Sequence, residues 1–133
     1  MDNKTYIAPE QEQRRWEILG RSTPPENYDH EEIIGVSEEV VRTLIEEGFL
    51  ESEDCHNCSP YVEDYLDFMS NYPGKFKLGG YVICPTRGDV RITFDAIESC
   101  GEVDLDMMID FTDRFRCADS FTMTSSCLFA WWD

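Results

Sequence analysis

The sequence predicts one α+β domain, in which helices pack on an antiparallel sheet. Two observations indicate this class. Residues 80–97 have the alternation and the central turn of a β-hairpin, and the segments on either side have the apolar spacing of helices, apart from an extended C-terminal tail. The 133 residues are enough for one domain with a sizeable core, and no linker composition divides them. We therefore expect a single domain over residues 1–133.

The hairpin is the clearest element in the sequence. Its second strand alternates apolar and polar side chains, as expected when one face of a strand is buried; the apolar positions are Val90, Ile92, Phe94 and Ala96. A β-branched and aromatic run at residues 81–84 predicts the first strand. Residues 85–89 supply the turn between the two strands.

The N-terminal third predicts a helix and an extended segment. Pro9 can begin the helix, because proline has no N–H to lose at the first helical position, and the helix would run to about Leu19 with Trp16 buried. Residues 1–8 would form an irregular arm. The sequence of residues 31–35 is ambiguous in secondary structure, and an extended segment is the preferred interpretation.

Two more helices are predicted before the hairpin. Ser37 is a suitable N-cap for one of them, which Gly48 ends. Ser59 and Pro60 would begin the next, which reaches about Ser70. The apolar positions of this last helix are Tyr61, Tyr65, Leu66, Phe68 and Met69.

After the hairpin the sequence predicts one helix and a C-terminal strand region. Asp104 would cap a helix that runs to about Cys117. Its buried side is expected to consist of Leu105, Met108, Ile109, Thr112 and Phe115. Residues 120–132 read as one or two strands, with Phe129 and Trp131 facing one way and their neighbours the other.

The net charge of −17 is the most unusual property of the sequence. Residues 26–67 carry 14 acidic side chains and one basic side chain, Arg42, whereas the rest of the chain has 14 acidic and ten basic side chains. Direct nucleic-acid binding is excluded, because it needs lysine and arginine to displace phosphate counterions. An anionic membrane surface is disfavoured for the same reason.

No apolar run approaches the roughly 20 residues of a membrane-spanning helix, and the N-terminus lacks the apolar segment of a secretion signal. A cytoplasmic location is therefore expected. Six cysteines in such a chain are expected to be mostly free thiols.

The first functional hypothesis is a non-enzymatic interaction module whose acidic helices bind a basic partner surface. In its sharpest form the protein would be an inhibitor that mimics nucleic acid and blocks a nucleic-acid-binding protein. The alternative for the same charge is a solvated face that keeps the protein soluble. The candidate partner-binding residues are Glu38, Glu39, Glu46, Glu47, Glu63, Asp64 and Asp67.

A second hypothesis is a small zinc protein centred on Cys55 and Cys58. Two sulfurs at this spacing can chelate one tetrahedral zinc ion. The site would need two more ligands, and the sequence has no second pair with metal-binding spacing. The alternative is a surface loop with two unpaired thiols; apart from zinc, no cofactor is predicted.

A third hypothesis is a small enzyme. Its pocket would lie by the C-terminal aromatic strand, near Tyr81 and Arg91. No residues in the sequence have the spacing of a known catalytic motif, so no catalytic residue is named and a non-enzymatic role is favoured.

Overall fold

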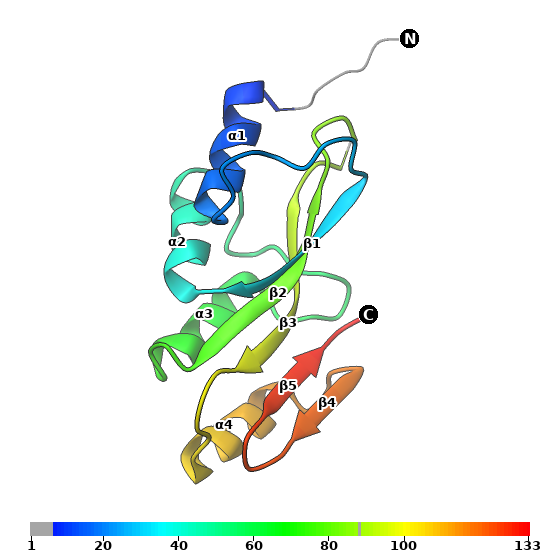
Figure 1. Ribbon diagram of the computed structural model, residues 1–133. Helices are drawn as coiled ribbons and strands as arrows, with labels where there is room; N and C mark the ends of the chain where they lie inside the picture. Colours follow the sequence, from blue (N-terminus) through cyan, green and yellow to red (C-terminus); the bar gives the residue numbers. More distant parts are fainter. Residues whose placement is uncertain (1–6, 88) are drawn as a thin grey trace.

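The computed structural model describes residues 7–87 and 89–133 and confirms the α+β class (Figure 1). Residues 1–6 of the predicted arm lie outside this range. The helices are α1 (Pro9–Ile18), α2 (Glu38–Glu46), α3 (Val62–Ser70) and α4 (Leu105–Phe115). The strands are β1 (His30–Val36), β2 (Phe76–Ile83), β3 (Ile92–Ser99), β4 (Ser120–Met123) and β5 (Leu128–Trp131).

The strands form one antiparallel sheet in the order β1-β2-β3-β5-β4. The predicted hairpin is β2 and β3, the undecided segment is edge strand β1, and the tail is β4 and β5. The helices follow one another along one side of the sheet, from α1 to α4 (Figure 1). We call the opposite face of the sheet the open face.

The core lies between the helices and the sheet. Apolar side chains of α2 and α3 meet those of the central strands there, and an aromatic cluster surrounds Phe68. The predicted alternation in β5 is confirmed, since Leu128 and Ala130 are fully buried while Phe129 and Trp131 lie on the other face. In the part of the chain that the structure describes, no helix has the length and apolar character needed to span a membrane.

Two of the predicted helix caps are confirmed. The Ser37 hydroxyl accepts a hydrogen bond from the Val40 backbone N–H, and the Asp104 carboxylate accepts one from that of Met107. The predicted start of α3 is wrong by two residues. Ser59 instead accepts a hydrogen bond from His56 N–H within the preceding loop, and the helix begins at Val62.

The predicted buried side of α4 is confirmed at Phe115 and in part at Met108, but it is wrong at Leu105 and Ile109. Met107, Phe111 and Phe115 face the core, whereas Leu105 and Ile109 are 69% and 54% exposed. The two apolar stripes lie side by side on the helix. The one that carries two phenylalanines buries more apolar area against the aromatic cluster, which favours this orientation.

A β-bulge interrupts the ladder between β2 and β3. Gly79 pairs with Ala96, but the next residue, Gly80, pairs with Phe94, which leaves Asp95 as the extra residue of β3. Asp95 and Ala96 therefore both turn toward the open face, because Phe94 and Ile97 on either side point into the core.

Candidate functional site: the open face of the sheet

The open face contains a hollow of about 410 Å³, which we call the open-face hollow. This volume is within the range of small-ligand sites. Its floor is made of the cross-strand pair Gly79 and Ala96. Larger side chains surround this floor. They belong to His30, Glu32, Ile34, Tyr81, Asp95, Phe129 and Trp131.

The strand register explains why these side chains meet. Residues directly opposite each other in an antiparallel sheet project from the same face. Glu32 lies opposite Tyr81, and Trp131 lies opposite Ala96. Because Gly79 has no side chain and Ala96 only a methyl group, the hollow lies between the aromatic residues of β2 and β5.

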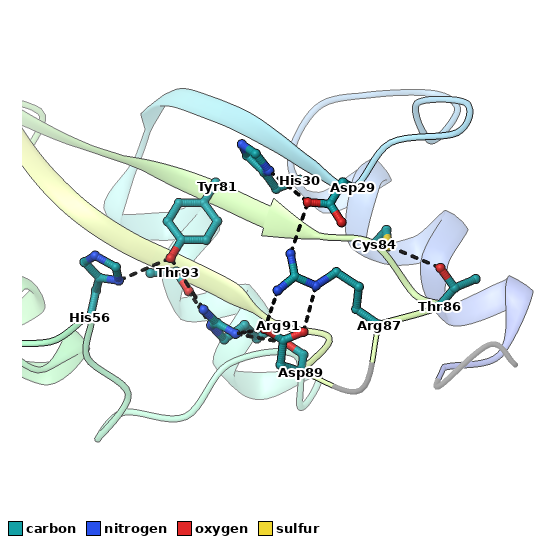
Figure 2. A network of polar contacts seen from close by, with 10 residues as sticks. All are labelled: Asp29, His30, His56, Tyr81, Cys84, Thr86, Arg87, Asp89, Arg91 and Thr93. Carbon is teal, nitrogen blue, oxygen red and sulfur yellow. Dashed lines mark hydrogen bonds and ion pairs between the residues drawn. The ribbon is translucent and has the colours of Figure 1, made fainter. Parts of the chain in front are cut away.

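Tyr81 connects the open-face hollow to a network of polar side chains (Figure 2). Its hydroxyl lies 3.2 Å from His56 Nδ1 and 3.5 Å from Arg91 Nη2. The rings of His30 and His56 both meet the tyrosine ring edge-on, with centroids 6.1 and 5.9 Å away. His56 comes from the loop between α2 and α3, so this loop contributes to a site on the far side of the sheet.

The arginines of this network are already paired. Arg91 Nη1 donates to Asp89 Oδ2 at 2.7 Å, and Arg91 Nε donates to Thr93 Oγ1. Arg87 donates to Asp89 through two nitrogens and contacts Asp29 at 3.2 Å (Figure 2). The hydrogen bond from Arg91 is the largest of the effects that lower the pKa of Asp89. These contacts leave little positive charge for the hollow itself.

The pKa of Asp95 is shifted in the opposite direction to that of Asp89. Partial burial raises the pKa of its carboxyl group above the usual value, although the neighbouring Trp131 and His56 side chains act in the other direction. Its ionised form is therefore incompletely compensated. Such groups are concentrated at functional sites.

We expect Asp95→Asn to raise the free energy of unfolding at pH 7. The raised pKa belongs to the folded state, so the neutral carboxyl group favours folding at low pH, and this contribution is lost as the pH rises through the folded-state pKa. Asparagine resembles the neutral form at every pH. The gain should therefore shrink to nothing below about pH 4, where the unfolded chain is also protonated.

Urea unfolding at pH 7 and pH 4 measures the free energy of unfolding of the variant and of the unmodified protein. Asp113→Asn is the control, because Asp113 is an exposed carboxylate of α4 with no ion pair among the described residues. An Asp95→Asn variant that is less stable than the unmodified protein at pH 7 would contradict the argument.

The predicted partner-binding carboxylates divide into two groups. Four make contacts within the molecule: Glu38 pairs with Arg42, Glu47 with Arg14 and Asp67 with Arg114, while Asp64 accepts a hydrogen bond from the Tyr61 N–H. The other three are exposed and have no ion pair with any residue that the structure describes; they are Glu39, Glu46 and Glu63.

The two cysteines of the predicted zinc site lie in the loop before α3, and both are exposed. Cys55 Sγ lies 3.8 Å from the carbonyl oxygen of Asn57. Over residues 7–87 and 89–133, no group of three His, Cys, Asp or Glu side chains is arranged to hold a metal ion. Among the described residues, no further donors complete a site with this pair, and the zinc hypothesis stays a prediction.

The sequence predicts a pocket by the aromatic C-terminal strand, near Tyr81 and Arg91. The open-face hollow lies by this strand and is lined by Tyr81, but not by Arg91. The sequence did not place Asp95 or His56 at this pocket. A signal for Asp95 was present in the glycine pair Gly79-Gly80 directly before the predicted strand, because glycine in or beside a strand often marks a bulge. For His56 the signal was absent, since its contact with Tyr81 joins residues 25 positions apart.

Comparisons of the chain with protein-family models, with curated proteins and with solved structures found no match.

Proposed function

We propose that the protein is a non-enzymatic module that binds a basic protein surface. The observation that carries this proposal is the set of exposed, unpaired carboxylates on α2 and α3. Glu39 and Glu46 are seven residues apart and lie on the same side of α2, about 10 Å apart along the helix. The single basic residue of the region, Arg42, is held by Glu38. A basic partner would therefore meet carboxylates that have no competing partner among the described residues.

The long-range electrostatic field of the net negative charge supports the same proposal. A net charge of −17 on 133 residues attracts a cationic partner and speeds its encounter with the protein. Complementary charges of this kind set the association rate and the choice of partner more than the final affinity.

We expect an arginine-rich peptide such as octa-arginine to bind, and its affinity to fall steeply between low and high salt. Glu39→Gln, Glu46→Gln and Glu63→Gln in one variant should weaken binding roughly tenfold, since each exposed charge pair contributes about 0.2–1 kcal/mol. Isothermal titration calorimetry at two ionic strengths measures both effects.

The matched control removes the same number of charges elsewhere, through Glu10→Gln, Glu102→Gln and Asp113→Asn. These three carboxylates are exposed and lie on α1, before α4 and on α4. The control should change the affinity by less than about twofold if the α2–α3 carboxylates are the contact. An affinity that does not depend on salt, or equal losses in both variants, would reject the proposal.

A further inference from the structure

The aromatic side chains of the open-face hollow have features of a cation-binding site. Tyr81, Phe129 and Trp131 contribute their rings to its wall. Organic cations bind to aromatic faces within about 6 Å of the ring centre, and tryptophan is the strongest partner. The ring of Tyr81 already has Arg91 at 6.0 Å. Within the described residues, no arginine or lysine lies over the rings of Phe129 or Trp131.

The charged groups of the hollow select the same kind of ligand. Two carboxylates line it, exposed Glu32 on β1 and half-buried Asp95 on β3, and its described lining contains no lysine or arginine. The nearby Arg87 and Arg91 are held by Asp29 and Asp89. A cation that entered the hollow would find negative charge that the surrounding protein compensates only in part.

The small floor gives such a ligand room to approach. At Gly79 the nearest atoms to an added Cβ would be 3.5 and 3.7 Å away, so the position is close to the backbone without being filled. A flat group can therefore lie over Gly79 and Ala96, between the ring of Trp131 and the carboxylates.

We propose that the open-face hollow binds an arginine side chain of the basic partner. A guanidinium group is planar, stacks on aromatic rings and presents a fork of N–H donors to a carboxylate, whereas the lysine ammonium group is a compact, strongly hydrated point charge. The inference rests on the proposed function, because it names the group of the partner that would be recognised. The raised pKa of Asp95 fits it, since a neighbouring cation would stabilise the ionised carboxylate.

The test uses two small probes of the same shape. N-acetyl-arginine amide carries the guanidinium charge, and N-acetyl-citrulline amide replaces it with a neutral urea group. We expect the arginine probe, and not the citrulline probe, to shift the indole N–H signal of Trp131 in NMR spectra. The signals of buried Trp16 and Trp132 should stay unchanged.

Substitutions in the hollow then test whether it is the site at which arginine binds. Trp131→Leu removes one ring, Asp95→Asn removes one carboxylate, and Gly79→Leu fills the floor. Each should weaken octa-arginine binding roughly tenfold. Leu105→Ala is the control, because it removes an exposed apolar side chain of α4, which belongs neither to the hollow nor to the α2–α3 carboxylates, and it should leave the affinity within about twofold. Circular dichroism confirms that each variant is folded, and a variant that does not fold is replaced by Ala96→Leu.

The outcomes separate the two proposals. If octa-arginine binds the unmodified protein and the hollow variants equally well, the arginine site is overturned while the proposed function stands. If the arginine probe shifts Trp131 but octa-arginine does not bind, the hollow recognises a guanidinium group, whereas the basic-partner function is overturned and the partner arginine with it. Equal shifts with the citrulline probe would also overturn the arginine site, because the hollow would then select shape and not charge.

Discussion

Gly80→Ala is expected to destabilise the fold by roughly 4 kcal/mol or more, which is exceptional for the addition of one methyl group. A Cβ on Gly80 would lie 1.8 Å from the carbonyl oxygen of Thr93 and 2.9 Å from Cα of Phe94. Both atoms belong to the backbone of β3. The clash cannot be relieved by a side-chain rotation, so the two central strands would have to separate at the bulge.

The neighbouring glycine is the matched control. A Cβ on Gly79 would make ordinary contacts with the Ile33 carbonyl and the Ala96 methyl group. Glycine inside a strand costs about 0.5–1 kcal/mol relative to alanine, so Gly79→Ala should be neutral or slightly stabilising. Urea unfolding of both variants measures the difference. If Gly80→Ala unfolded at the same midpoint as Gly79→Ala, the bulge would not be a tight backbone contact.

This comparison also concerns function, because the bulge turns Asp95 toward the open-face hollow. Gly80 therefore determines which side chain of β3 lines the site. Gly79 determines how deep the site is. The two adjacent glycines thus have separable roles: Gly80 in the pairing of β2 with β3, and Gly79 in the depth of the open-face hollow.

The parts of the fold that depend on local chemistry were predictable from the sequence. The alternation in β3 and β5 and the N-caps at Ser37 and Asp104 involve residues within a few positions of one another, so their signals lie within one short window. The start of α3 was not predictable in the same way. A serine–proline pair before a helix resembles a cap and a first turn, but here Ser59 is used by the loop.

The orientation of α4 could not be obtained from its own sequence. The helix carries one apolar stripe at Met107, Phe111 and Phe115 and another that includes Leu105 and Ile109, and both have helical spacing. Only the neighbouring strands and α3 decide which stripe is buried. The same limit applies to the candidate site, where His56 and Asp95 are brought together by a long-range loop contact and by a bulge.

Arg15→Met is expected to cost about 3–5 kcal/mol, because it would leave the buried carboxylate of Glu12 without its counterion. Arg15 and Glu12 are 2% and 7% exposed. Arg15 Nε contacts Glu12 Oε1 at 2.5 Å, and Arg15 Nη2 donates to the Ile83 carbonyl at 2.6 Å and to the Tyr28 hydroxyl at 2.8 Å. This network attaches α1 to the end of β2.

The Tyr28 hydroxyl is the third side-chain group of this network. Its hydroxyl donates to Glu12 Oε2 at 2.7 Å, and burial, followed by this hydrogen bond, raises the pKa of Tyr28 to about 12. Glu12→Gln together with Arg15→Met removes both charges, and the pair should recover much of the stability lost in the single variant, as a double-mutant cycle can measure. A double variant less stable than Arg15→Met alone would contradict a charge-pair origin.

Arg14→Met is the control for this prediction, since Arg14 is the adjacent arginine and also has an ion pair, with Glu47. That pair is exposed to solvent, so its loss should cost no more than about 1 kcal/mol. Equal losses for Arg14→Met and Arg15→Met would show that burial does not distinguish the two pairs. Ile83, whose carbonyl Arg15 holds, is two residues from Tyr81 on the same strand. Loosening this end of β2 should therefore also weaken octa-arginine binding, and the Arg14→Met control should not, beyond the small change expected of an exposed charge.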